Sequence, residues 1–426
     1  MVFIRDAEVE SIIRSFSAPL FRAAGMNPHD VSIRLVKNKT LNAFVAGGRN
    51  IFIHTGLIIE SEGPDALIGV IAHETGHIQD GHLVRTRATI DTARSIQMIG
   101  TVLGVLAAGA SGNAAAGSAI ALGSQSTSQR IFMAHSRTQE SAADQAAMRL
   151  LDTTGRTAKG LEDFLGVLKN QNVLSRRLQT PYMQTHPLNQ TRIDTLHSFI
   201  KKSPNSKHTA SKAEILAHAR MVAKLYGFIE PLSKVLKRYP ESDQSFAGRY
   251  ARAIAYYRHP DLEKALKILS ELMTERPNDP YLFELKGQML FEHGRQKEAL
   301  KAYQKSYALA PQEELIVLEL ARVELEVGGD HLLDKSIEHF KRSISMGHST
   351  NFTWRQLGIA YGRKGKMGLS SLALAEAELR IGQLANSEFL ANRALHELDK
   401  GTSAHIQAQD ILASIKAFRD SKAAEK

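Results

Sequence analysis

The motif His-Glu-x-x-His at residues 73–77 lies inside an apolar, helix-forming run and constrains the fold more than any other feature of the chain. Residues four apart lie on one face of a helix, so His73 and His77 can bind one metal ion together. The carboxylate of Glu74 then lies beside an open coordination position. The apolar residues 67–71 indicate burial, where these polar groups would be costly without a metal. The motif predicts a zinc site on a buried helix, although the same letters also occur by chance on solvated helices.

A third protein ligand must come from elsewhere in the chain, because a catalytic zinc usually takes three protein donors and a water. The best candidate is Glu140, in a predicted second helix that Ser136 and Gln139 would open as a capping box. Asp144 shares a face with Glu140, and nearby alanines would let this helix approach another closely. We predict that Glu140 binds the metal and that Asp144 orients a ligand histidine from behind. Without the motif at residues 73–77, this string would indicate an ordinary salt-bridge face.

These residues resemble metallopeptidase family forty-eight, the HtpX-like zinc peptidases, which use a glutamate as the third ligand. Four blocks carry the match, namely Asn42-Ala43-Phe44 with Gly47-Gly48 and Gly56-Leu57, the motif at residues 73–77, the stretch from Glu140 to Asp144, and Thr185-His186-Pro187 followed by Arg192. The blocks follow the family's order and span most of the first 200 residues. The resemblance implies an α+β, gluzincin-type zinc peptidase domain with a small sheet.

The resemblance also implies roles for His186 and Arg192. From the sequence alone, a histidine before a proline in a polar loop is typical of a turn. In family members of this architecture, that histidine can occupy the fourth zinc position of a resting enzyme, and the nearby arginine supports the site. His186 would then be either a removable plug or a donor to the transition state, and the sequence leaves both roles open.

The expected reaction follows from the properties of the ion. Zinc lowers the pKa of a bound water toward about 7 and polarises the scissile carbonyl. Glu74 would take the proton of that water and deliver it to the leaving amine. The predicted catalytic residues are Glu74, His186 and Arg192, the predicted zinc ligands are His73, His77, Glu140 and His186, and Asp144 is the predicted supporting residue.

Residues 49–54 alternate between polar and apolar side chains and predict a strand, with Gly47-Gly48 as the turn before it. In the family, the edge of such a sheet flanks the zinc cleft, so an extended polypeptide could add to it as a further strand. Recognition through backbone hydrogen bonds favours unfolded or misfolded substrates. His54, on the predicted strand, is expected to be structural rather than a ligand.

A 34-residue period marks the second half of the chain. Ala253, Ala265 and Pro277 recur 34 residues later as Gly287, Ala299 and Pro311, and Trp354-x-x-Leu357-Gly358-x-x-Tyr361 is a further copy. This period and its small residues are typical of tetratricopeptide repeats, so residues 210–426 are predicted to form an all-α solenoid of roughly four to six repeats. A solenoid presents a concave surface, and we expect these repeats to bind substrate or outer-membrane protein assembly machinery.

The composition fits two or more domains and excludes some partners. A chain of 426 residues exceeds one typical domain, and the polar stretch 201–207 predicts a boundary between a peptidase domain at residues 1–205 and repeats at 210–426. The formal charge of +10 favours peripheral contact with acidic lipid headgroups or envelope polyanions. Lys and Arg are spread along the chain without a nucleic-acid motif, so no nucleic-acid partner is expected. The absence of cysteine excludes disulfides.

A long segment without charge lies between the motif and Glu140. No charged residue occurs between Arg94 and Arg130, and residues 98–110 are apolar apart from Thr101. That run is shorter than the roughly 20 apolar residues that a bilayer span needs. We predict that residues 95–129 form a lid or a membrane-touching hairpin. The alternatives are a transmembrane pair and an ordinary buried helix with a glycine-rich loop.

The expected location and function follow from the resemblance. The first residues lack the basic and apolar regions of a signal peptide. Family members that join this peptidase to tetratricopeptide repeats, the BepA-like group of Gram-negative bacteria, are exported, so we expect a periplasmic protein that starts after its signal. The expected activity is hydrolysis of peptide bonds in misfolded or stalled outer-membrane proteins. The alternative is a chaperone or assembly scaffold that acts through its repeats while His186 keeps the cleft closed.

Overall fold

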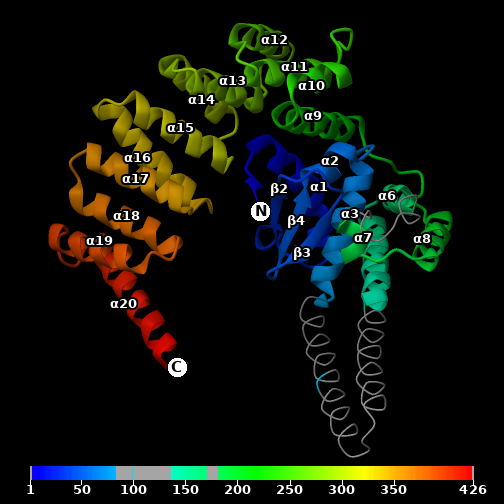
Figure 1. Cartoon of the computed structure of the whole chain (residues 1–426), viewed down its shortest axis with the longest axis horizontal. Coiled ribbons are helices and arrows are strands. Elements are labelled where there is room, and N and C mark those ends of the chain that lie inside the picture. The colour runs from blue at the N-terminus through cyan, green and yellow to red at the C-terminus, as the bar shows by residue number, and fades with distance from the viewer. Residues whose placement is uncertain (1, 83–97, 99–135, 170–180, 425–426) are drawn as a thin grey trace, which may run out of the picture. The chain divides into compact units, whose positions relative to one another are not determined.

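The computed structural model of the chain describes residues 2–82, 98, 136–169 and 181–424. The chain divides into two compact units, Met1–Ile229 and Glu230–Lys426 (Figure 1). Within the described residues, the first unit combines a small sheet with helices and the second contains helices alone. The mainly α architecture predicted from the sequence, an α+β domain followed by an all-α repeat region, is confirmed.

Four short strands form the sheet of the first unit, and they are β1 (Phe3–Ile4), β2 (Ser32–Val36), β3 (Ala43–Ala46) and β4 (Asn50–His54). Their order is β1-β2-β4-β3, so β3 is an edge strand. β2 and β4 run parallel, whereas β3 and β4 form an antiparallel pair. Gly47 and Gly48 connect this pair with φ of 60° and 92°, a backbone conformation that favours glycine. The predicted strand and the turn before it are confirmed.

The two faces of the sheet have different environments. Ile51 and Ile53 of β4 are completely buried, whereas Phe52 between them is only partly buried on the opposite face. Helix α1 (Ala7–Ala23) contacts β2, and helix α3 (Pro64–Gln79) contacts β3. The alternation of strand side chains therefore separates a core face from a partly open face.

Helix α3, which carries the His-Glu-x-x-His motif, runs through the core of the first unit. It begins after Gly63 with Pro64 at its first position, where the missing N–H costs nothing. All of its residues from Leu67 to His77 are buried. Local sequence thus starts the helix, and its apolar side chains on all sides place it inside the domain.

Two glycines allow α3 to approach its neighbours closely. A Cβ at Gly69 would lie 2.8 Å from the backbone nitrogen of Leu161 in α6 (Lys159–Lys169). A Cβ at Gly76 would lie 2.9 Å from the carbonyl oxygen of Ala143, in a helix whose described part covers residues 136–153. The expected close approach of the alanine-rich helix to another helix is therefore confirmed.

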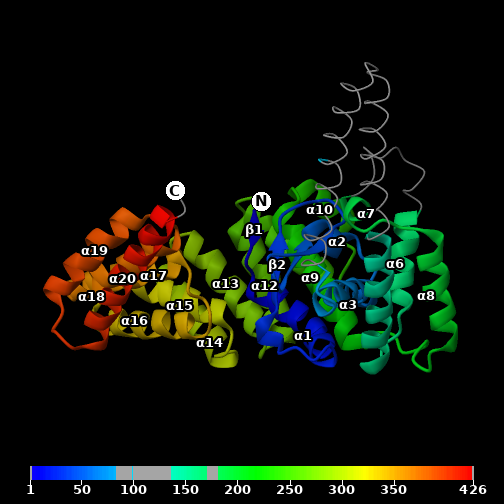
Figure 2. The same ribbon diagram turned by 90° about the horizontal axis from the view of Figure 1, so that it is seen from below.

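The remaining helices of the first unit are η1 (Pro28–Asp30), α2 (Thr55–Glu60), α7 (Pro181–Thr185), α8 (Gln190–Lys202) and α9 (Lys212–Ile229). Helices α3, α6 and α8 lie side by side in both views of the unit (Figures 1 and 2). The predicted capping box at residues 136–139 is wrong. Ser136 is already helical, and the side-chain amide of Gln139 donates to the carbonyl of His82 at 3.1 Å.

Helix α9 packs against α1, α2 and α3 and belongs to the first compact unit. Buried ion pairs fix it there, since Arg220 Nε donates to Glu8 at 2.7 Å and Lys224 Nζ lies 2.9 Å from Asp6. The predicted domain limits, 1–205 and 210–426, differ from the observed division after Ile229 by this helix.

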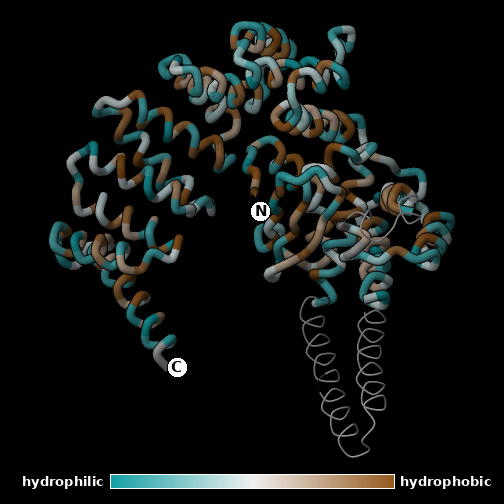
Figure 3. Tube along the Cα trace, viewed as in Figure 1, coloured by the Kyte–Doolittle hydropathy of each residue, from teal (hydrophilic) through white to brown (hydrophobic). Residues whose placement is uncertain are grey.

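The second unit consists of successive helix pairs. Its helices are α10 (Leu232–Arg238), α11 (Phe246–Arg258), α12 (Leu262–Glu275), α13 (Pro280–Glu292), α14 (Gln296–Leu309), α15 (Glu314–Val327), α16 (Asp330–Ser345), α17 (Asn351–Arg363), α18 (Met367–Arg380), α19 (Leu384–Glu397) and α20 (Ser403–Ala424). The starts of α11, α13 and α15 are 34 residues apart, which confirms the predicted period. Apolar and polar residues alternate around these helices (Figure 3), as expected for amphipathic elements that pack on one side.

The membrane-related prediction falls largely outside the described residues. Of the segment 95–129, the structure describes Met98 alone, whose side chain is exposed. None of the described helices combines the length and the apolar content that a bilayer crossing requires.

Candidate metal centre

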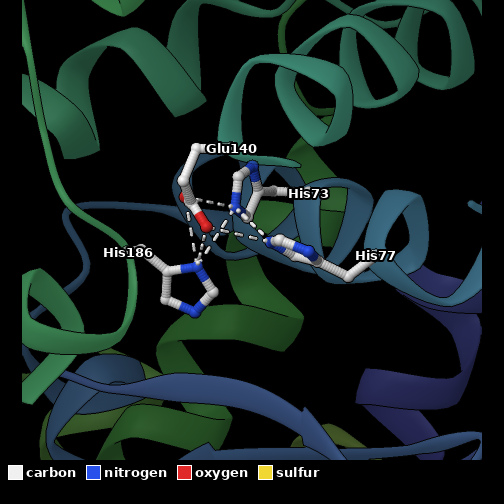
Figure 4. Close-up of side chains that lie close together, drawn as sticks. All are labelled: His73, His77, Glu140 and His186. Atoms are coloured by element: carbon white, nitrogen blue, oxygen red, sulfur yellow. Dashed lines mark hydrogen bonds and ion pairs between the residues drawn. The ribbon is translucent and has the colours of Figure 1, made fainter. Parts of the chain in front are cut away.

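Four side chains from three segments of the first unit converge on one point (Figure 4). His73 and His77 come from α3, Glu140 from the helix at residues 136–153, and His186 from the residue after α7. One nitrogen or oxygen atom of each lies within 4.8 Å of the others, and all four residues are buried. The four-residue spacing of the two α3 histidines places both rings on the same helical face.

The donor atoms are separated by distances that suit a small cation. Nε2 of His73 lies 3.1 Å from Nε2 of His77 and 3.4 Å from Nδ1 of His186. The carboxylate of Glu140 lies 3.4 Å from Nε2 of His73 and 3.5 Å from Nε2 of His77. It also lies 3.1 Å from Nδ1 of His186. Ligands about 2.0–2.1 Å from a tetrahedral zinc ion are roughly 3.3–3.4 Å apart, so this donor set fits zinc in chemistry and spacing.

Asp144 and Arg192 lie directly behind the four donors. Oδ1 of Asp144 is 2.9 Å from Nδ1 of His73, so this ring turns its Nε2 toward the cluster. Arg192 donates two hydrogen bonds to Asp144, at 2.6 and 2.9 Å, and its Nη1 lies 2.9 Å from Glu140. One buried guanidinium therefore offsets the charge of two buried carboxylates. Asn189 caps α8 by accepting from the backbone N–H of Arg192 at 3.0 Å, which fixes where this arginine starts.

Residues 4–200 match the sequence model of Peptidase family M48. This part of the chain is a Peptidase family M48 domain. The assignment agrees with the resemblance carried by the four motif blocks, and it makes the first unit a metallopeptidase domain. The convergence of the predicted residues in space agrees with that family, although their individual roles remain predictions.

Curated relatives of the M48 domain extend into the repeats. A beta-barrel assembly-enhancing protease of Yersinia pestis is 25% identical over 298 residues, which are 67% of this chain and 58% of that protein. The Escherichia coli K12 protein of the same name is 24% identical over 329 residues, or 76% of this chain and 66% of that protein. A TPR repeat-containing protein of Methanocaldococcus jannaschii is 29% identical over 154 residues, 36% of this chain and 26% of that protein. The chain thus spans less than two thirds of the length of both proteases.

Glu74 of the M48 domain is a buried carboxylate with unusual surroundings. Its side chain is completely buried, and neither oxygen has a hydrogen-bond partner among the described residues. Oε1 lies 3.4 Å from Nε2 of His186. Burial raises the pKa of the Glu74 carboxyl. A buried acceptor without a partner is costly to the fold, so its position beside the donor set is consistent with a catalytic purpose.

The charges of the M48 domain distinguish the two histidines of α3. Burial lowers the pKa of His73, but hydrogen bonds with Asp144 and Glu140 outweigh it and raise the value to about 10. Burial lowers the pKa of His77 well below its usual value, and the positive charge of His73 adds to this effect. Burial opposes ionisation of Glu140, but His186 and His73 together hold its pKa well below the usual range. Glu140 is therefore an anionic donor at neutral pH.

Two residues near the donors were not predicted from the sequence. The buried ring of Tyr182 lies 4.5 Å from the ring of His186 and supports it from one side. Nδ1 of His82 lies 2.9 Å from Nδ1 of His77. Both had a weak signal, because Tyr182 precedes His186 by one helical turn and His82 follows the motif by five residues. His54 lies outside the donor cluster and contacts Thr40 at 2.9 Å, as its predicted structural role requires.

Proposed function

We propose that this chain is a zinc-dependent endopeptidase whose metal is held by His73, His77 and Glu140. The observation that carries the proposal is the convergence of four buried donor atoms beside the carboxylate of Glu74, which has no hydrogen-bond partner among the described residues. Charged and polar groups are rarely buried in such density without a cation to bind.

In this proposal, Glu74 is the general base and then the general acid. A bound zinc ion supplies Lewis acidity, because it lowers the pKa of water to about 7 and polarises a carbonyl. Glu74 accepts the proton of the attacking water and returns it to the leaving amine. Its raised pKa favours this double role, since a carboxyl that titrates nearer to neutrality can both take and give a proton.

The variant Glu74→Gln tests the proposal directly. The amide keeps the size of the side chain but cannot accept the proton, so we expect parental zinc content and a loss of roughly 10²- to 10⁴-fold in the cleavage of unfolded casein. Zinc is measured by mass spectrometry of the purified chain, and cleavage by release of peptides. A parental cleavage rate in this variant, or an activity that survives a metal chelator, would contradict the proposal.

His186 fills the fourth donor position and represents a closed, resting site. Its Nδ1 lies among the donors, while its Nε2 lies 3.4 Å from Glu74 and 3.3 Å from the carbonyl oxygen of Ala43. A substrate carbonyl needs the same place, so the imidazole must move before cleavage. The variant His186→Ala distinguishes the two roles considered for this residue. A plug predicts faster cleavage of casein, whereas a transition-state donor predicts slower cleavage at unchanged zinc content.

The edge strand β3 provides a place for an extended substrate. The backbone N–H of His54 donates to Asn42 at 2.9 Å, and hydrogen-bonded pairs alternate along an antiparallel ladder. Asn42, Phe44 and Ala46 therefore point their backbone groups toward β4, and Ala43 and Val45 point theirs outward. A substrate strand would pair with these outward groups. It would do so next to the donor cluster, because the Ala43 carbonyl is the one that His186 contacts.

We further propose that the substrates are misfolded or stalled outer-membrane proteins in the periplasm. The support is the shared name of the two relatives, beta-barrel assembly-enhancing protease, together with strand pairing as the means of recognition. In this proposal the repeats of the second unit recruit substrate or assembly machinery, because a solenoid offers a surface rather than catalytic groups. The formal charge of +10 supports peripheral contact with anionic envelope components.

A chaperone or assembly scaffold with a latent peptidase site is the second candidate function. The observation in its favour is the position of His186 inside the donor set, which blocks the site at rest. Complementation separates the two candidates in a strain that lacks the protein. If Glu74→Gln restores outer-membrane protein assembly completely, the scaffold function is sufficient; if it fails, proteolysis is required.

A further inference from the structure

A third histidine pairs with the zinc-facing histidine at the end of α3. Nδ1 of His77 lies 2.9 Å from Nδ1 of His82, and the two rings meet at an interplanar angle of 71°. Both side chains are buried. The chain reverses between them, because Gly81 has a φ of 65° and its N–H donates to the carbonyl of Ile78. This glycine turn brings residue 82 back against residue 77.

The contact fixes the tautomers of both rings. Nε2 of His77 faces the other donors, so it must present a lone pair there and carry its proton on Nδ1. That proton is donated to His82, whose own Nδ1 must therefore be the acceptor. The proton of His82 then resides on its Nε2, which lies 3.8 Å from a carboxylate oxygen of Asp80. Asp80, His82 and His77 thus form a chain of polar contacts that ends at the metal position.

The two histidines of α3 are held in the same way by different partners. Nδ1 of His73 faces the carboxylate of Asp144 at 2.9 Å, whereas Nδ1 of His77 faces the imidazole of His82. Histidine ligands generally donate their second N–H to such an acceptor, and loss of the acceptor usually costs 10- to 100-fold in metal affinity. The sequence alone predicted this support for one of the two rings.

We propose that His82 is a positioning residue that holds His77 in its metal-binding tautomer and orientation. The inference rests on the proposed zinc site but concerns a residue outside the ligand set. Replacement of His82 by alanine removes the acceptor and leaves the Nδ1 proton of His77 buried without it. Zinc affinity is expected to fall about 10- to 100-fold.

Two amide variants distinguish positioning from simple packing. In His82→Asn, the side-chain oxygen occupies the place of Nδ1, so the hydrogen bond with His77 is kept. In His82→Gln, the oxygen lies one atom farther out, near the place of Nε2. We expect Asn to retain zinc affinity within about threefold of the parent, and Gln to lose it as alanine does. The matched control is His197→Asn on α8, an exposed histidine outside the site, which should behave like the parent.

The measurement is the zinc dissociation constant of the full chain, obtained by competition with a chromophoric chelator. Thermal unfolding at saturating zinc shows whether each variant is folded. Equal affinity in all the His82 variants would overturn the inference, as would equal affinities of the Asn and Gln variants. A parental chain that binds no zinc would overturn the proposed function, and this inference with it.

A second inference rests on the register of β3 rather than on the donors. Phe44 lies opposite Phe52 of β4, and the two rings stack at 5.0 Å. Phe3 of β1 lies 6.1 Å from Phe52 on the same face and is 50% exposed. The three rings form an aromatic strip, defined here as Phe3, Phe52 and Phe44, across the partly open face of the sheet. The strip ends at the edge strand where a substrate would add.

Strand geometry determines which substrate side chain meets this strip. Phe44 directs its own backbone groups toward β4, so the residue opposite it on an added antiparallel strand forms a non-hydrogen-bonded pair. Side chains in such pairs are the closest across two strands, with Cα atoms about 4.5 Å apart. We infer that Phe44 is a specificity-determining residue that selects an apolar or aromatic substrate side chain. A strand with an apolar residue at every second position suits this face.

Mapping of cleavage sites in unfolded casein tests this inference, which rests on the proposed strand addition. The parent should show enrichment of apolar residues at one fixed distance from the cut bond. Phe44→Leu should keep that enrichment, whereas Phe44→Lys should replace it with acidic residues at the same position. Unchanged enrichment in Phe44→Lys would overturn the inference. A parent that does not cleave at all would overturn the proposed peptidase instead.

Discussion

The two units of the chain bury polar groups in opposite ways. The first unit concentrates charges in one place, where His73, Glu74, His77, Glu140, Asp144 and Arg192 are all buried together. The second unit distributes neutral hydroxyls along its length. Buried serines donate to a backbone carbonyl of the neighbouring helix at 2.8–2.9 Å, and these pairs are Ser306 with Pro280, Ser336 with Ala321, Ser370 with Gly358, and Ser387 with Ala375.

This difference shows what each unit is adapted to do. Burying charges costs several kcal/mol per ion unless every partner is in place, so a charge cluster is retained where chemistry needs it. A serine that donates to a carbonyl satisfies itself locally and adds little charge or volume. The same arrangement can therefore be repeated from one helix pair to the next. The first unit depends on a few exact contacts, and the second depends on many similar ones.

The largest expected effect is that of Arg192→Ala, because it leaves two buried carboxylates without their common cation. We expect the first unit to lose about 3–5 kcal/mol of unfolding free energy, and zinc affinity to fall roughly 10- to 100-fold. Urea unfolding and chelator competition measure the two quantities. The matched control is Arg295→Ala in the second unit, whose ion pairs with Glu263 and Glu298 are exposed, and it should change little. Similar losses in both variants would contradict the contrast between the units.

An intermediate effect is expected from His218 of α9, whose pKa burial lowers to about 4. The unfolded chain takes up this proton near pH 6.5, whereas the folded chain resists it until about pH 4. Stability is therefore unaffected above pH 6.5 and is lost as pH falls from 6.5 to 4, by about 3 kcal/mol. Urea unfolding across this range measures the loss. His218→Gln should flatten that pH dependence, and a slope equal to that of the parent would contradict the assignment.

The smallest effect is expected in the repeats, from Gly287→Ala. The added Cβ would lie 2.6 Å from the buried ring of Tyr303, so the two helices of this pair must shift. We expect a loss of about 1–3 kcal/mol in the second unit, with unchanged zinc affinity. Gly362→Ala on α17 is the control, because the nearest atom is at 3.4 Å and alanine favours helix. A fall in zinc affinity in either variant would show that the units are coupled.

The sequence predicted the parts of the site that depend on local periodicity. His73 and His77 were identifiable because residues four apart share a helical face, and Glu140 with Asp144 because they repeat that spacing. The resemblance added His186, which as a residue before proline in a polar loop had no distinguishing local pattern. The structure brings all these side chains together with Arg192, and the fold class was predicted correctly.

Other features depend on contacts that no local pattern records. Helix α9 joins the first unit through Glu8 and Arg220, which are 212 residues apart in the chain. Its amphipathic pattern looked like that of the repeats that follow. The support of His77 by His82 depends on the turn at Gly81, whose direction the sequence does not show. Ser136 resembled an N-cap by its position, but tertiary packing extends that helix at least to Ser136 itself.

The absence of a side chain at Gly76 has a consequence for the choice of ion. This residue touches the backbone of Ala143, one turn after Glu140, so the gap between two metal-binding helices is as narrow as a peptide backbone allows. A single methyl group there would spread the helices and enlarge the cage that receives the ion. Cation size is thus calibrated from outside the cage, by a hydrogen atom that faces away from it.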